Sequence, residues 1–114
     1  GIVRLGPEAP VPDWFNGPGL AAAIRASDEL TLLCLQDRIP DGVKPDLNWR
    51  CFRSVGPFAF NATGIVLSLI QPLSTQGIGI FVVCTFDGEH ILVADKEWNR
   101  SRLLLEEAGH SFVE

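Results

Sequence analysis

An α+β fold, with antiparallel sheets that carry helices on one face, is predicted for this chain by three features. Two segments, residues 62–76 and 96–108, have apolar residues at helical spacing. A short strand candidate with imperfect alternation, residues 49–55, precedes the first of them, and an apolar segment rich in β-branched residues follows it. A strong turn signal, Asp87-Gly88, separates two apolar runs and predicts a hairpin. Together these features give the order β-α-β-β-α-β, which is the ferredoxin-like arrangement.

The strands of this second half are predicted from apolar runs bounded by turn residues. Residues 78–86 (IGIFVVCTF) are continuously apolar and are expected to form a central strand. The other three strands are expected at residues 49–55, 89–94 and 111–114.

The two helices have recognisable ends. Asn61 is expected to cap the first helix and Gly77 to follow it as the C′ residue. Pro72 removes the hydrogen bond to the Ser68 carbonyl and is expected to kink this helix or end its regular part early. Asp95 is expected to cap the second helix. The expected apolar faces are Ile65, Val66, Leu69, Ile70 and Leu73 on the first helix, and Trp98, Ser101, Leu104, Leu105 and Ala108 on the second.

The first half is less regular. A strand is expected at residues 1–5, a helical turn at residues 13–15, and a hairpin around Asp28-Glu29. Residues 37–48 contain two prolines and are expected to be a linker or single turns. The segments AIRASDELTLLC and VCTFDGEHILVA share a plan of apolar strand, Asp-containing turn and apolar return. We therefore expect residues 1–47 to be a reduced copy of the unit formed by residues 48–114.

Composition limits the function classes. The chain has 114 residues, 46% of them hydrophobic, and a formal net charge of −5. Scattered basic residues and a negative charge argue against nucleic-acid binding. No apolar run reaches the roughly 18 residues that a membrane span needs, and no signal peptide is visible, so a cytoplasmic location is expected. The three cysteines, Cys34, Cys51 and Cys84, are expected to be reduced and buried in strands rather than paired.

The sequence contains no recognisable catalytic constellation. The histidines, His90 and His110, are expected on a strand and on the surface after a helix, and neither is expected to act as a base. Glu106 and Glu107 are consecutive in a helix and point in different directions. No zinc-like spacing, nucleotide loop or nucleophile motif occurs. We therefore expect no enzyme activity, no metal and no cofactor.

One local feature suggests binding. The segment Asn61-Ala62-Thr63-Gly64 opens the expected helix and places Gly64 in its first turn, where glycine costs about 1 kcal/mol relative to alanine. Its use there suggests either close approach of a ligand to the backbone or tight packing of the helix on the sheet. The free N–H groups of a helix start attract anions such as a carboxylate.

The segment FNATGIVLSLIQPLSTQGIGIFVVCTFDGEHILV resembles the core of an ACT domain. The chain is also similar to small bacterial tandem-ACT proteins and to the ACT modules of eukaryotic cytosolic arginine sensors. The matching pieces are Thr63-Gly64, Pro72-Leu73, Gly77-Ile78, Thr85-Phe86, Asp87 and Leu92-Val93, with VPDW and RIPDGVKPDLNWRC before them. The resemblance covers nearly the whole chain. It departs from many amino-acid-binding ACT domains at Asn61, where they carry aspartate.

The resemblance implies a homodimer of tandem ACT-like units that binds an amino acid or similar metabolite between units and regulates another protein. Asp87 would pair with a cationic group of the ligand, and the loop of residues 61–64 would meet its α-amino and α-carboxyl groups through backbone atoms and the Thr63 hydroxyl. The expected ligand-binding residues are Asn61, Thr63, Gly64, Ile65, Thr85, Phe86 and Asp87. The alternative that the resemblance leaves open is a dimerisation or interaction module that binds no ligand.

Overall fold

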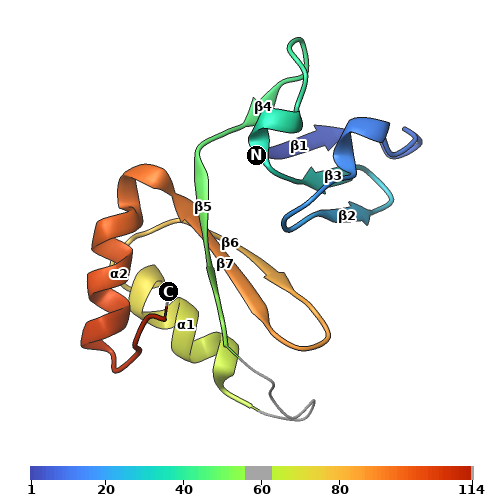
Figure 1. Ribbon diagram of the computed structural model, residues 1–114. Helices are drawn as coiled ribbons and strands as arrows, with labels where there is room; N and C mark the ends of the chain where they lie inside the picture. Colours follow the sequence, from blue (N-terminus) through green and yellow to red (C-terminus); the bar gives the residue numbers. More distant parts are fainter. Residues whose placement is uncertain (56–62, 114) are drawn as a thin grey trace. The chain divides into compact units, whose positions relative to one another are not determined.

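The computed structural model describes residues 1–55 and 63–113 of the chain, which form two compact units, Gly1–Asn48 and Trp49–Glu114 (Figure 1). Asn61, for which a cap and a ligand contact were expected, lies outside the described residues. Each unit has its own antiparallel sheet. Each is also built around its own cluster of buried apolar side chains.

The N-terminal unit is a four-stranded sheet in the order β2-β3-β1-β4. Its strands are β1 (Ile2–Leu5), β2 (Ala22–Arg25), β3 (Leu30–Leu33) and β4 (Pro45–Asp46), with short 3₁₀ turns at Asp13–Phe15 and Gln36–Arg38. The strand expected at residues 1–5 and the turn at residues 13–15 are confirmed. The expectation of only a linker or single turns for residues 37–48 is wrong in part, because β4 pairs with β1. Val3, Leu30 and Leu32 form the core of this unit.

Both predicted hairpins form, but each turn lies one residue earlier than expected. Arg25 pairs with Leu30 and the Ala26 N–H donates to the Glu29 carbonyl, so Ser27-Asp28 form the tip of the first turn. In the second hairpin Cys84 pairs with Glu89, so its tip is Phe86-Asp87.

The C-terminal unit has the element order β5-α1-β6-β7-α2 and the strand order β5-β7-β6. Both helices lie beside each other on one side of the sheet (Figure 1). This arrangement confirms the predicted α+β, ferredoxin-like fold. Its elements are β5 (Trp49–Arg53), α1 (Ile65–Ser74), β6 (Ile80–Cys84), β7 (Glu89–Ala94) and α2 (Trp98–Glu107).

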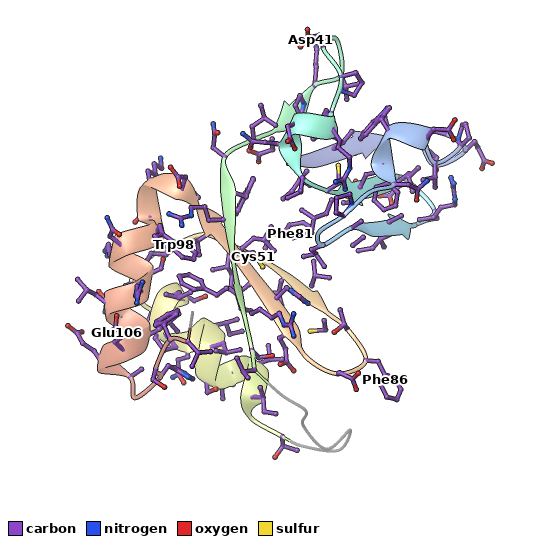
Figure 2. The ribbon with its side chains drawn as sticks, in the orientation of Figure 1. Asp41, Cys51, Phe81, Phe86, Trp98 and Glu106 are labelled. Atoms are coloured by element: carbon purple, nitrogen blue, oxygen red, sulfur yellow. The ribbon has the colours of Figure 1, made fainter. Side chains whose placement is uncertain are left out.

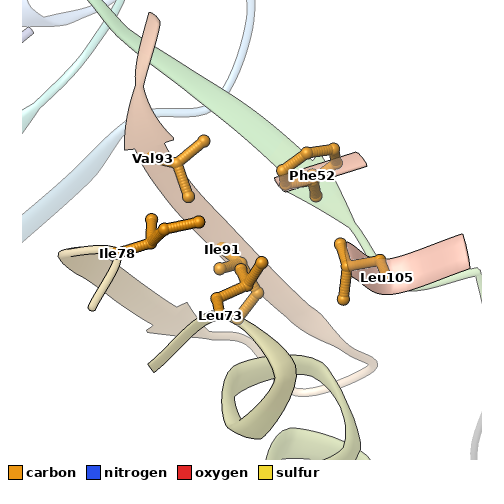
Figure 3. Close-up of a cluster of buried hydrophobic side chains, with 6 residues drawn as sticks. All are labelled: Phe52, Leu73, Ile78, Ile91, Val93 and Leu105. Carbon is orange, nitrogen blue, oxygen red and sulfur yellow. The ribbon is translucent and has the colours of Figure 1, made fainter. Parts of the chain in front are cut away.

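Alternation along the strands explains why the core lies on the helix side. Phe52 on β5 pairs with Ile91 on β7, and both point toward the helices. Each helix supplies one side chain that is almost completely buried there, Leu73 from α1 and Leu105 from α2. Figure 3 shows these side chains meeting in a single cluster with Ile78 and Val93. The predicted apolar faces of both helices are therefore confirmed, except that Ala108 is exposed.

The sixth element expected from the sequence does not form in the described residues, because residues 111–113 have no strand structure. The Phe112 ring instead lies 5.3 Å from the Phe52 ring, with the Arg102 guanidinium 5.0 Å above it. This aromatic contact and a hydrogen bond from His110 to α1 hold the segment against the helix side. Glu114 lies outside the described residues.

Both helices begin later than predicted, and both end close to the predicted position. Helix α1 begins at Ile65 rather than residue 62, and α2 begins at Trp98 after a 3₁₀ turn over Asp95–Glu97. Asp95 makes no side-chain cap and lies 3.7 Å from Arg50 instead. At the end of α1, Gly77 donates to Ser74 and Ile78 donates to Leu73, the bond pair of a glycine-terminated helix.

The cysteines are all free, as expected, but only Cys34 is buried. The prediction of burial is wrong for Cys51 and Cys84. Cys51 lies on the sheet face opposite Phe52 and the helices, and Cys84 lies at the end of β6 next to the hairpin turn. No helix of the described residues is long and apolar enough to cross a membrane.

Candidate functional site

A cleft of about 330 Å³ lies in the C-terminal unit, between the end of β5 and the tip of the β6–β7 hairpin. This volume is at the lower end of the roughly 300–1,000 Å³ typical of small-molecule pockets. Its lining combines both charge signs with hydroxyl groups and consists of Arg53, Ser54, Val55, Thr85, Asp87, Gly88, Glu89 and His90.

A row of paired residues brings the first part of this lining together. Arg53 pairs with His90, and His90 pairs with Val83 on the other side of β7. Paired residues of an antiparallel sheet project from the same face. Phe52 points toward the helices, so the row of Arg53 and His90 lies on the face that carries no helix.

A compact hydrogen-bond network fixes the wall of the cleft. The Ser54 N–H donates to the Glu89 carbonyl at 3.0 Å, and the Glu89 N–H donates to the Ser54 Oγ at 2.9 Å. The Ser54 hydroxyl in turn donates to the Glu89 carboxylate at 2.9 Å. One carboxylate of the cleft is therefore already used within the protein.

Gly88 has a role that the sequence did not reveal. Glycine in a hairpin turn often supplies a positive φ, but the Gly88 backbone does not lie in the left-handed region. A Cβ at this position would instead lie 2.9 Å from the Ser54 Oγ. Glycine is needed here because the Ser54–Glu89 network occupies the space that a side chain would fill.

Thr85 is tied to the turn. Its N–H donates to the Gly88 carbonyl at 2.8 Å, and its hydroxyl lies 3.1 Å from the same oxygen. The residue therefore closes the hairpin, and it also lines the cleft. Phe86 lies at the tip, with 81% of its surface exposed, and points away from the sheet (Figure 2).

The cleft retains two opposite charges that are not neutralised locally. Within residues 1–55 and 63–113, neither Arg53 nor Asp87 takes part in an ion pair or a side-chain hydrogen bond. Both line the cleft. No ion pair therefore joins Arg53 to Asp87 within the cleft.

His90 adds a titratable group. Burial lowers the pKa of His90, and the Arg53 charge lowers it further, although Glu89 opposes them. The ring Nδ1 lies 3.8 Å from the Sγ of Cys51, and partial desolvation of this thiol raises its pKa although the residue as a whole is exposed. A raised thiol pKa opposes thiolate formation, so this pair lacks the activated sulfur of a catalytic cysteine.

The predicted site residues divide into two groups. Thr85 and Asp87 line the cleft, and Phe86 stands beside it at the tip. Thr63, Gly64 and Ile65 are not part of its lining. Sequence reasoning missed Arg53, Ser54, Glu89 and His90, although the pairing of residues 49–55 with residues 89–94 was the signal that could have placed them together.

Gly64 has a conformational reason for being glycine. It precedes α1 rather than lying in its first turn, with φ 79° and ψ −2° in the left-handed region. Its carbonyl accepts the first helical hydrogen bond, from the Ser68 N–H at 2.9 Å. Backbone geometry therefore accounts for this glycine without requiring a ligand.

Among the described residues, no group of three or more side chains could hold a metal ion.

The C-terminal unit is thus a helix-covered antiparallel sheet with a small cleft, lined by side chains of both charge signs, at one end. The chain belongs to the ACT domain family, whose profile it matches over residues 45–106. ACT domains are regulatory modules that bind small molecules. Residues 1–42 match a separate family of N-terminal domains. No curated protein matches the chain.

Two solved structures are similar to the chain. Protein Atu0741 from Agobacterium tumefaciens is 52% identical, with a TM-score of 0.93 over 98% of this chain and 84% of that one. VC0802 from Vibrio cholerae is described as a protein of unknown function and possible transport protein. It is 19% identical, with a TM-score of 0.63 over 78% of this chain and 69% of that one, and it supports the fold alone.

Proposed function

We propose that this protein is a regulatory sensor that binds a zwitterionic metabolite, most simply an amino acid, in the cleft at the tip of the β6–β7 hairpin. The observation that carries the proposal is the pair of opposite, locally uncompensated charges, Arg53 and Asp87, that line one small cleft. A free amino acid presents an α-carboxylate and an α-ammonium group. Arg53 would donate two hydrogen bonds to the carboxylate in a bidentate contact, and Asp87 would accept hydrogen bonds from the ammonium group.

The cleft suits a ligand of this size. A volume of about 330 Å³ accommodates one small molecule rather than a peptide segment or a nucleotide chain. Glu89 supplies a second carboxylate to the cleft, and one of its oxygens already accepts the Ser54 hydroxyl. Thr85 contributes little to ligand choice, since its hydroxyl is directed to the Gly88 carbonyl.

The helix start completes the proposal. Thr63 and Gly64 are exposed and precede α1, where free backbone N–H groups favour an anion. We propose that this segment, with Asn61 and Ile65, contacts a ligand bound to a neighbouring copy, which places the ligand at an interface between ACT domains. Arginine is one candidate ligand, since its guanidinium would be a second cation available to Asp87.

Thermal-shift screening of the purified protein against the amino acids tests the proposal. A ligand at one hundred times its Kd stabilises the folded state by about 2.7 kcal/mol, which raises the melting temperature measurably. We expect at least one amino acid to raise it in the wild type but not in Asp87→Ala. A well-folded sample that shifts with none of them would contradict the proposal.

An association module that binds no ligand is the second candidate. It is favoured by the uncharged edge strand β6 (Ile80–Cys84), whose outer backbone groups have no strand partner in the described sheet. This function predicts a stable oligomer whose properties are all unchanged by Asp87→Ala. A monomer at micromolar concentration would exclude it.

A further inference from the structure

Arg53 and His90 are direct neighbours across strands β5 and β7, and both line the cleft. The Ser54 N–H donates to the Glu89 carbonyl, so these two residues form a hydrogen-bonded pair. Hydrogen-bonded and non-hydrogen-bonded pairs alternate along an antiparallel ladder, so Arg53 and His90, one step along, form a non-hydrogen-bonded pair. The side chains of such a pair lie closer together than those of a hydrogen-bonded pair.

The surroundings of His90 hold it neutral in the free protein. Burial and the Arg53 charge lower the pKa of His90, and Glu89 opposes them. Its partner on β6, Val83, carries no charge. Within residues 1–55 and 63–113, the charged or titratable groups that contact His90 or line the cleft with it are Cys51, Arg53, Asp87 and Glu89.

The two ring nitrogens of His90 have different surroundings. The Cys51 thiol donates to the Phe52 carbonyl at 3.3 Å, so its sulfur can accept the Nδ1–H of His90 at 3.8 Å. This arrangement keeps the single proton of the neutral ring on Nδ1 and leaves a lone pair on Nε2. In the part of the chain that the structure describes, Nε2 has no hydrogen-bond partner. Nε2 is therefore the nitrogen that can gain a proton.

We propose that His90 is a second anion-binding residue of the cleft, which takes up a proton when a carboxylate binds beside Arg53. The proton comes from solvent and adds to the lone pair of Nε2. The new N–H can donate to one carboxylate oxygen while Arg53 donates to the carboxylate as well. This inference rests on the proposed function, because it concerns how the same cleft holds the carboxylate of its ligand.

The carboxylate removes the obstacle to a second cation in the cleft. Without a ligand, a protonated His90 would be repelled by its neighbour Arg53. A bound carboxylate attracts both cations and so raises the pKa of His90. The affinity for a carboxylate is therefore lowest where the ring is neutral with and without ligand. It rises as the pH falls below the pKa of the complex, and it becomes constant once the free protein is also protonated.

Proton NMR of the imidazole signals tests the proposal, with acetate as the carboxylate probe. The chain has two histidines, His90 and His110, and the spectrum of His90→Gln assigns both signals. Titration between pH 8 and pH 5.5 is compared in acetate and in chloride at equal ionic strength. We expect acetate to move the midpoint of His90 to higher pH and to leave that of His110 unchanged. Acetate should bind about threefold or more tightly at pH 5.5 than at pH 8.

Two variants separate the role of His90 from other effects of pH. His90→Gln should bind acetate through Arg53 with an affinity that does not depend on pH in this range. His110→Gln is the matched control, because His110 is not part of the cleft lining, and it should keep the wild-type pH dependence. In Arg53→Gln, acetate should no longer move the midpoint of His90.

Two results would overturn the inference. One is a His90 midpoint that is the same in acetate and in chloride. The other is an acetate affinity with the same pH dependence in the wild type and in His90→Gln. If either result appears while an amino acid still raises the melting temperature, only the role of His90 fails. If neither acetate nor any amino acid has an effect, the proposed function fails as well.

Discussion

The His110 Nε2 donates a hydrogen bond of 2.8 Å to the Ser68 carbonyl, the acceptor that Pro72 deprives of its helical partner. Proline has no N–H, so the carbonyl four residues earlier lacks the usual bond. Helix α1 nevertheless continues to Ser74. A residue just beyond the end of α2 thus hydrogen-bonds to a carbonyl in the middle of α1.

This relationship predicts energetic coupling between His110 and Pro72. His110→Ala should destabilise the protein by about 0.5–1.5 kcal/mol, the usual net value of a hydrogen bond. In a Pro72→Ala background the helical N–H of residue 72 can bond to Ser68, so the same change should cost clearly less. Urea unfolding of the four proteins measures the coupling. Equal costs in both backgrounds would show that His110 does not serve this carbonyl.

Gly88→Ala should destabilise the C-terminal unit by about 1–3 kcal/mol, as overpacking does elsewhere. The new Cβ would lie 2.9 Å from the Ser54 Oγ and would displace a group that bonds to Glu89. The matched control is Gly79→Ala, because a Cβ there meets nothing within 4 Å. Equal thermal stabilities of the two variants would argue against the spatial role assigned to Gly88.

Gly64→Ala should destabilise the protein by about 1–2 kcal/mol through backbone strain, because φ is 79°. No Cβ contact adds to this cost, since the position is open within 4 Å. Asparagine tolerates the left-handed region better than alanine, so Gly64→Asn should lose less stability than Gly64→Ala. Chemical denaturation ranks the variants, and an alanine variant as stable as the wild type would refute the conformational explanation.

The lowered pKa of His90 predicts that the stability of the protein depends on pH. Burial and Arg53 lower its folded pKa below the ordinary value of 6.5, while Glu89 opposes them and the nearby Cys51 thiol remains neutral. Above pH 6.5 His90 is neutral in both the folded and the unfolded state, so its contribution to the free energy of unfolding is constant. As the pH falls through 6.5, the unfolded chain binds the proton first, so the folded state loses stability until its own pKa is reached.

The variant His90→Gln should therefore lose less stability than the wild type between pH 7.5 and pH 5, because glutamine does not titrate. Urea midpoints at several pH values within this range provide the comparison. Identical pH profiles for the two proteins would contradict a lowered pKa at His90.

Much of the C-terminal fold could be predicted because periodicity and helix-ending glycines are local signals. Residues 89–94 form a strand over the predicted range, and Gly77 ends α1 as expected. The last strand was predicted wrongly because an apolar segment such as residues 111–113 can bury its side chains against a helix layer as well as in a sheet. Nothing local distinguishes the two outcomes, which depend on Phe52 and Arg102 in space.

The candidate site could be predicted only in part. Asp87 stood out because it lies in a recognisable turn, but the turn register depends on the pairing of Cys84 with Glu89 and shifted the tip by one residue. Arg53 was missed because a charge near the end of a strand has no local signature of function. Only strand pairing, which joins residues far apart in sequence, brings it to the same cleft as Asp87.

Calorimetric titration of the amino acid found by screening, together with its des-amino analogue, tests the central proposal most directly. We expect Asp87→Asn to weaken the amino acid about tenfold or more, as for loss of a charged hydrogen bond, and to leave the des-amino analogue unchanged. Arg53→Gln should weaken both ligands. Affinities that are unchanged in both variants would contradict the assignment of this cleft as the binding site.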